Sequence, residues 1–214
     1  GWMPWAWESA RWVHVATPGN EHLPDVARGV ETQRVELGRE VKAADVEDIG
    51  TRVKAALQGA RRAFLSVAGP AALACYLGAL LKNQPMEIRV MHVHQPVQAW
   101  WSTRRGIALD ETVTRDDGVA SLVLGARGTP VRDWQVVGPR NFMPEAVEPT
   151  LRTLSTRIQA CREAHLALAC PVAVAFAAGT VLRNATRRVT VHQYDSGRYV
   201  PWFVLEQSGP RVLA

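Results

Sequence analysis

The chain contains an internal repeat: residues 61–83 align without gaps with residues 162–184, at an offset of 101 positions, and ten of the 23 aligned pairs are identical. The same offset aligns residues 88–95 with residues 189–196. Self-similarity at a fixed offset is the sequence signature of duplicated supersecondary structure. We therefore predict two copies of one strand–helix–strand unit, so that the chain is a pseudo-dimer within a single polypeptide.

Each copy of the repeat reads as a buried strand, a tight turn, and a helix that begins at Pro70 or Pro171, since proline is tolerated in the first helical turn. One more strand and one amphipathic helix precede each copy: strands at 11–16 and 120–126, helices within 41–57 and 144–164. Strands that alternate with helices predict parallel pairing with right-handed crossovers. The predicted fold class is α/β, with two Rossmann-like halves built from mostly parallel sheets flanked by helices.

The length of 214 residues allows one large domain or two small ones. The repeat favours a single domain over residues 1–214, with a first half at 1–105 and a second half at 106–214. The polar segment 104–118 is the expected join. Because the chain opens with Gly1 and not with methionine, we expect a domain cut from a longer protein.

Two apolar stretches, residues 63–81 and 165–182, approach the roughly 20 residues that cross a bilayer. Each has a proline near its middle, and arginines or other polar residues limit each run. A strand, a turn and a buried helix explain both stretches better than a membrane span does. We therefore expect no membrane span in this chain.

The formal net charge is +5, and only three of the 25 basic residues are lysines. Arginine forks suit phosphate groups, although genome composition alone also explains a preference for arginine. The charges are scattered without a basic run, so long nucleic acid is not the expected partner. The three cysteines show no CxxC pair, which indicates neither a disulfide framework nor a zinc site and fits a reducing cytoplasm.

Ligands of open parallel sheets bind at the carboxyl ends of the strands. In the first half these ends are Thr17-Pro18-Gly19, Gly69-Pro70-Ala71 and His94-Gln95, and in the second half they are Arg127-Gly128-Thr129, Cys170-Pro171-Val172 and Gln193-Tyr194. Free N–H groups of the helices that begin after Gly69 and Cys170 are natural seats for phosphates. The alternative is that these glycines and prolines only make tight turns, but the duplication favours two quasi-equivalent seats for a ligand with several phosphates.

The sequence contains no GxGxxG, GxxxxGK[ST], HExxH or GxSxG motif, so we expect no dinucleotide cofactor and no catalytic residues. His92 and His94 lie on one face of a strand, as two metal ligands do. The positions aligned with them in the second copy do not repeat the pair, so we expect no metal. Packing for one histidine and a ligand-facing hydrogen bond for His94 are the preferred roles.

Eight tryptophans outnumber phenylalanine and tyrosine together. Trp101 and Trp202 align at the repeat offset and are expected in the core. Trp100 and Trp134 are candidates for stacking on a base, although core packing is the preferred interpretation. Trp2, Trp5 and Trp7 crowd the N-terminus and are expected to contact the body or a partner domain.

The repeated arrangement resembles the SAVED domain, a fusion of two CARF-like halves. It is carried by an apolar strand, a small residue with proline, an alanine-rich helix with a central glycine, and a strand that runs into HQYDSGRYVPWFVL at residues 192–205. The resemblance is strongest over residues 162–205, clear over 61–101, and weak before Lys54. The first copy lacks a tyrosine equivalent to Tyr194, so its ligand contacts are less defined.

The resemblance implies a sensor of CBASS or type III CRISPR antiphage defence that binds a cyclic oligonucleotide, such as a cyclic tri- or tetraadenylate, in a basic pocket shared by both halves. It implies head-to-tail assembly on ligand binding, and activation of a fused or partner effector that is absent from these 214 residues. Arg127 is then the expected charge partner of a phosphate. Thr17, Thr129, His94, Gln95, Gln193 and Tyr194 are the expected contacts to sugar and base edges.

Two other functions stay open. The first is a ring nuclease that cleaves its cyclic ligand by attack of a ribose 2′-hydroxyl, with His94 or His192 as general base. The second is a protein-interaction module that uses the tryptophan-rich N-terminus and ignores nucleotides. The sequence specifies neither ring size nor bases of a ligand.

Overall fold

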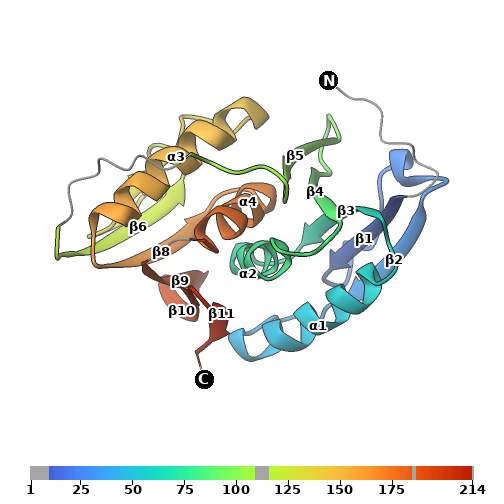
Figure 1. The fold of residues 1–214 in the computed structure, drawn as a ribbon, viewed down its shortest axis with the longest axis horizontal. Coiled ribbons are helices and arrows are strands. Elements are labelled where there is room, and N and C mark those ends of the chain that lie inside the picture. Colours follow the sequence, from blue (N-terminus) through green and yellow to red (C-terminus); the bar gives the residue numbers. More distant parts are fainter. Residues whose placement is uncertain (1–9, 109–115, 185–186, 214) are drawn as a thin grey trace.

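The computed structural model of the chain describes residues 10–108, 116–184 and 187–213. Two sheets enclose two central helices, α2 (Ala71–Leu81) and α4 (Val172–Leu182), which lie side by side between them (Figure 1). The first sheet contains β1 (Ala10–Ala16), β2 (Glu31–Glu36), β3 (Arg62–Ala68), β4 (Glu87–His92) and β5 (Gln98–Ser102). The second contains β6 (Val119–Gly125), β7 (Gln135–Val137), β8 (Glu163–Ala169), β9 (Arg188–Asp195), β10 (Arg198–Glu206) and β11 (Gly209–Val212).

Both sheets are mostly parallel. The first has the strand order β2-β1-β3-β4-β5, in which only β5 is antiparallel to its neighbour. The second has the order β11-β10-β9-β8-β6-β7, in which β6 to β9 pair in parallel and β10 and β11 extend the sheet as antiparallel strands. Helices α1 (Val46–Leu57) and α3 (Pro144–Ala160) pack beside α2 and α4. The predicted fold class is confirmed.

The elements of the two halves begin at matching positions. β8, α4 and β9 each start 101 residues after β3, α2 and β4, as the sequence repeat predicts. β6 starts 109 residues after β1, so the second half uses eight fewer residues between its first strand and the next central strand. The duplicated unit is therefore larger than the strand–helix–strand repeat and includes the first strand of each half.

Several element boundaries differ from the predictions. The helix predicted within 144–164 ends at Ala160, because β8 begins at Glu163. Pro70 and Pro171 are not the first helical residues: both have extended backbone and precede their helices as N-caps. Two short edge strands, β2 and β7, were not predicted before the helices, and most side chains of β2 are exposed, which removes the apolar signal of a strand.

The two central helices cross with their backbones in close contact at a pair of glycines that are equivalent in the repeat. A Cβ atom added to Gly78 would lie 2.0 Å from the carbonyl oxygen of Phe176, and one added to Gly179 would lie 2.0 Å from that of Cys75. No side chain fits at either position, so glycine permits the approach. The crossing explains why the central glycine of each alanine-rich helix recurs in the repeat.

Nearly every residue of α2 and α4 is buried, because sheets and helices surround them on all sides. Each long apolar stretch is thus divided between a strand and a buried helix of 11 residues. Within the described ranges, no helix has both the length and the apolar character needed to cross a bilayer.

One hydrophobic core is shared by both halves and extends from β1 to β10. Trp101 and Trp202 are 2% and 6% exposed, which confirms their prediction as core residues. Trp101 on β5 also joins the halves, since its indole N–H donates a hydrogen bond of 2.9 Å to the hydroxyl of Thr180 on α4. A smaller core on the outer face of the first sheet packs Trp12, Phe64 and Met91 beneath the segment 17–30.

A candidate ligand cavity between the two halves

A cavity of about 800 Å³ opens at the carboxyl ends of β1, β3 and β4, where loops of the first half meet the start of α4. Its volume lies within the range of about 300 to 1,000 Å³ that is typical of small-molecule sites. The lining residues of the first half are His14, Thr17, Gly19, Asn20, His22, Leu23, Pro24, Val67, Ala68, Gly69, Met91, His92, Val93, His94 and Gln95. The second half contributes Cys170, Pro171 and Val172.

Equivalent turns follow the first strand of each half. Residues 17–20 and 126–129 each close with a hydrogen bond of 3.1 Å from the fourth residue's N–H to the first residue's carbonyl oxygen. The third residue is Gly19 or Gly128, with φ of 88° and 92°, a region that glycine adopts without strain. The second residue is Pro18 in the first half and Arg127 in the second. The same turn therefore presents a rigid apolar ring in one half and a cation in the other.

His14 on β1 is held in place by a buried hydrogen-bond network. Trp12 donates its indole N–H to the Ser66 hydroxyl at 2.8 Å, and Ser66 lies 2.6 Å from Nδ1 of His14. Nε2 of His14 lies 2.8 Å from the carbonyl oxygen of Asn20. These partners are all satisfied when the imidazole is neutral, with Nδ1 accepting from Ser66 and Nε2–H donating to Asn20. Ser66 is fully buried, so it supports the wall and does not act as a nucleophile.

His92 and His94 lie at the end of β4, with their ring centroids 5.3 Å apart. His92 stacks on the buried Trp100 with a centroid distance of 4.4 Å. Burial, with a smaller contribution from His94, lowers the pKa of His92. His92 therefore has the packing role that the sequence assigned to one histidine of this pair while it also lines the cavity, and His94 is exposed beside it.

The cavity contains four of the chain's six histidines but, among its described lining residues, no arginine, lysine, aspartate or glutamate. The resemblance implied a basic pocket, and this cavity is not basic. Nor do the described residues contain a group of three or more histidine, cysteine or carboxylate side chains placed to hold a metal ion. The described wall of the cavity offers a ligand hydrogen bonds and apolar contacts but no charged carboxylate, lysine or arginine side chain.

Gln193, near the end of β9, makes one of the contacts between the two halves. Its side-chain oxygen accepts a hydrogen bond of 3.0 Å from the N–H of Ala72 in the first turn of α2. One of the free N–H groups that a phosphate would use at α2 is thus already occupied. The aligned residue of the first half is His92, for which no such bond to α4 is present in the described structure.

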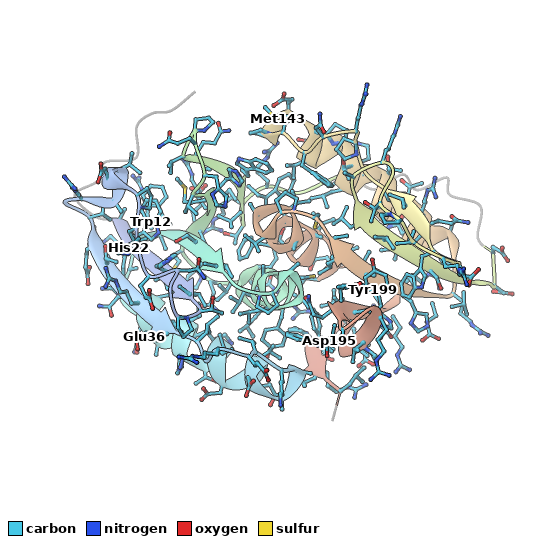
Figure 2. The ribbon with its side chains drawn as sticks, turned by 180° about the vertical axis from the view of Figure 1, so that it is seen from behind. Trp12, His22, Glu36, Met143, Asp195 and Tyr199 are labelled. Carbon is cyan, nitrogen blue, oxygen red and sulfur yellow. The ribbon has the colours of Figure 1, made fainter. Side chains whose placement is uncertain are left out.

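Three aromatic rings, those of Trp134, Tyr194 and Tyr199, form a cluster on the second sheet near the turn between β9 and β10. Tyr194 is 57% exposed and packs edge-on against Tyr199, with centroids 5.5 Å apart, and Tyr199 contacts Trp134 at 5.2 Å. Figure 2 shows Tyr199 and His22 on opposite halves of the molecule. The aromatic cluster is therefore separate from the histidine-lined cavity.

A second histidine pair lies behind this aromatic cluster. Nδ1 of His165 is 3.0 Å from Nε2 of His192, and Trp134 contacts the His192 ring edge-on. Burial, with a smaller contribution from His165, lowers the pKa of His192 to about 4. His192 is 8% exposed and does not line the cavity.

The predicted site residues divide into three groups. Those that line the cavity are Thr17, Gly69, His94, Gln95, Cys170, Pro171 and Val172. Pro18 and Pro70 are adjacent in the chain to lining residues, and Ala71 lies one residue further along. Those that lie on the second half outside the cavity are Arg127, Thr129, Gln193 and Tyr194. The tryptophans at positions 2, 5 and 7 lie outside the described residues.

Sequence reasoning missed His14, Asn20, His22 and Leu23 as lining residues. His14 belongs to a predicted strand, and its alternation with the core residues Val13 and Val15 could have placed it on the opposite face. His22 and Leu23 follow the Thr17 turn in an irregular loop. Their return to the sheet edge depends on packing against Trp12 and Phe64, which no local pattern encodes.

No protein-family model and no curated protein matches this sequence. Solved structures do match. The Moraxella osloensis Cap4 SAVED/CARF-domain containing receptor has 13% sequence identity and a TM-score of 0.58, over 93% of this chain and 50% of that one. The Acinetobacter baumannii receptor of the same description, with the cyclic trinucleotide 3′3′3′-cAAA, has 11% identity and a TM-score of 0.57, over 91% and 51%. With 2′3′3′-cAAA it has 12% identity and a TM-score of 0.55, over the same shares.

The chain thus spans about half the length of these structures. At this level of identity the likeness establishes the fold, and this chain has the two-half α/β fold of SAVED/CARF-domain receptors.

Proposed function

We propose that a chain with this fold acts as a sensor domain that binds a cyclic oligonucleotide between its halves. The observation that carries the proposal is the position of the cavity. It lies at the carboxyl ends of parallel strands, where such sheets bind ligands, and residues of both halves line it. Two of the structures that share the fold contain cyclic trinucleotides.

The proposed ligand is a cyclic tri- or tetraadenylate or a related ring. Binding between the halves is proposed to trigger head-to-tail assembly and to activate an effector, either fused to residues 1–214 or a separate subunit, in the cytoplasm. The sensor itself is proposed to be non-catalytic. The domain then comprises a first CARF-like half at 1–105 and a second at 106–214.

A thermal-shift screen against cyclic di-, tri- and tetranucleotides tests the proposal, since a ligand at a hundred times its Kd stabilises the folded state by about 2.7 kcal/mol. We expect a large rise in Tm with one cyclic species. His94→Ala and Gln95→Ala should reduce this rise without changing the Tm of the free protein, whereas Gln207→Ala, at an exposed turn between β10 and β11, should leave it unchanged. No shift with any cyclic species would refute the sensor function.

Cleavage of the cyclic ligand is a second candidate, and the observation that favours it is the clustering of four histidines around the cavity. Because His192 is buried away from this cavity, the general base in such a reaction would be His94. Chromatography of the ligand after incubation distinguishes the two functions: intact ligand supports a sensor, and linear product that His94→Ala no longer forms supports a ring nuclease.

A partner-binding module that ignores nucleotides is the remaining alternative. It would rest on the tryptophans near the N-terminus, and it would leave every cyclic nucleotide without effect on the Tm.

A further inference from the structure

We infer that the cavity at the carboxyl ends of β1, β3 and β4 receives a neutral nucleobase of the ligand. The ligand's phosphates then lie outside it, against the arginines of the second half. The inference rests on the proposed function and specifies how the two halves divide recognition. It contrasts with a shared basic pocket, in which each half would hold a phosphate.

The first step is the absence of fixed charge. None of the 18 described lining residues is an arginine, lysine, aspartate or glutamate, although the chain has a net charge of +5. Proteins hold phosphates with cationic forks combined with free N–H groups. The cavity therefore lacks the cationic part of a phosphate site, although the start of α4 in its wall has no side-chain cap.

The second step is the state of the histidines. The partners of His14 are satisfied by a neutral ring, and burial lowers the pKa of His92. Burial therefore disfavours a positive charge on His92. The other two, His22 and His94, are exposed at the rim of the cavity, where their ring nitrogens are within reach of a ligand's polar edge.

The third step is the match between the walls and a flat heterocycle. Leu23 and Val172 are half-buried and provide apolar surface for the faces of a ring, with the buried Val67 and Met91 behind them. The edge is polar, and its amides are Asn20 and Gln95. Asn20 donates its amide N–H to Thr17 at 3.0 Å, which leaves its side-chain oxygen as an acceptor. An amide pairs its donor and acceptor with the amino group and adjacent ring nitrogen of adenine.

The fourth step is the position of free cations beside the cavity. Gly125 at the end of β6 pairs with Ala169, the residue before Cys170 in the cavity wall. Arg127 follows two residues later, and its N–H donates to the carbonyl oxygen of Pro139, which brings Arg140 to the same edge. Both arginines are exposed, and in the described part of the chain neither forms an ion pair with a carboxylate. They are available for phosphates next to a base in the cavity.

Isothermal titration at pH 7.5 with adenosine, inorganic pyrophosphate and the cyclic adenylate that shifts the Tm most tests this division. We expect adenosine to bind and to be displaced by the cyclic adenylate but not by pyrophosphate. Arg127→Ala should weaken binding of the cyclic adenylate at least tenfold while the adenosine Kd changes less than twofold. Displacement of adenosine by pyrophosphate, or an equal loss for both ligands in Arg127→Ala, would overturn the inference.

A cavity-filling variant gives an independent test. Leu23→Trp should reduce the affinity for both adenosine and the cyclic adenylate more than tenfold, whereas Val26→Trp, on the same segment but outside the cavity, should change neither. If Leu23→Trp does not fold, Gln95→Leu replaces it, with a loss of at least fivefold expected. A cyclic adenylate that binds unchanged when the cavity is filled would overturn the inference but leave the sensor function standing. A chain that binds no cyclic nucleotide refutes the function itself.

Discussion

The carboxyl ends of the two sheets share a backbone and differ in chemistry. Equivalent turns carry Pro18 in one half and Arg127 in the other, and equivalent positions on β4 and β9 carry His92 and Gln193. One end forms a cavity without fixed charge, and the other presents arginines and exposed tyrosine. The comparison teaches that the two halves keep the same backbone frame at these edges while the side chains on it differ.

The outer faces of the two sheets differ in the same way. In the first half, Phe64 and Met91 lie in an apolar cluster beneath the segment 17–30. In the second half the aligned residues are His165 and His192, which hydrogen-bond to each other. The outer face of the first sheet therefore carries an apolar cluster, whereas that of the second sheet carries a hydrogen-bonded pair of histidines. Each of the following experiments alters one matched pair of features.

The largest expected effect comes from the crossing of α2 and α4, which both halves build alike. Gly78→Ala and Gly179→Ala should each lower the free energy of unfolding by at least about 3 kcal/mol, because the new methyl group overlaps a carbonyl oxygen of the facing helix. Urea denaturation measures the loss. Gly106→Ala is the control, since an added Cβ there meets open space. Loss from only one of the two glycine variants would contradict the symmetry of the crossing.

A smaller effect is expected at Thr180, whose hydroxyl accepts the indole N–H of Trp101. The aligned residue in α2 is Ala79, so this bond joins the halves on one side only. Thr180→Val should cost about 2 kcal/mol, because it leaves a buried N–H without an acceptor. Thr153→Val on the exposed face of α3 removes a hydroxyl that bonds only within its helix and should be nearly neutral in the same denaturation experiment. Equal losses would mean that the Trp101 bond contributes nothing.

The two outer faces should respond differently to acid. The pKa of His192 is about 4 in the folded state, below the ordinary value of 6.5, so the unfolded chain binds more protons between these values. Stability from the neutral ring is therefore complete above pH 6.5 and is lost as the pH falls toward 4, by about 1 to 2 kcal/mol after allowance for screening.

His192→Met, which gives the second half the residue of the first, should flatten this pH dependence. Thermal melts from pH 7.5 to 4.5 compare the variant with the unaltered chain. Parallel curves for the two proteins would show that His192 does not carry the effect.

The smallest expected effect concerns the helix starts. Gln193→Ala removes the acceptor for the Ala72 N–H and should lower stability by about 0.5 to 1 kcal/mol, as loss of a helix cap does. His92→Gln places the same amide opposite α4 but removes the ring that stacks on Trp100, so it should not raise the Tm of the free protein. Differential scanning calorimetry resolves both changes. A Gln193→Ala variant as stable as the unaltered chain would contradict a capping role.

The repeat predicted the central elements well, because β3, α2, β8 and α4 are buried and their apolar periods are strong. It also pointed to the crossing of α2 and α4, since the central glycine of each helix recurs at the same place in the repeat. The edge strand β2 escaped prediction because its side chains are largely exposed, so neither alternation nor a continuous apolar run marks it.

The cavity lies at the edge of the first sheet where the sequence predicts a ligand site, because parallel strands bring their carboxyl ends together. The residues that line it were predicted only in part. His22 lies in a loop whose Leu23 packs against the apolar cluster that contains Trp12, and Gln193 meets Ala72 across 121 positions of sequence. Both contacts depend on tertiary structure, and a local pattern contains no record of them.

The glycine seam between α2 and α4 also determines what this architecture permits that two separate subunits do not. A homodimer presents every residue twice and dissociates on dilution. Because a single chain supplies both sides of this seam, its halves stay associated at any protein concentration, and a substitution on one side is not copied to the other. Covalent fusion thereby removes the constraint of two-fold symmetry and allows equivalent positions of the two halves to carry different side chains.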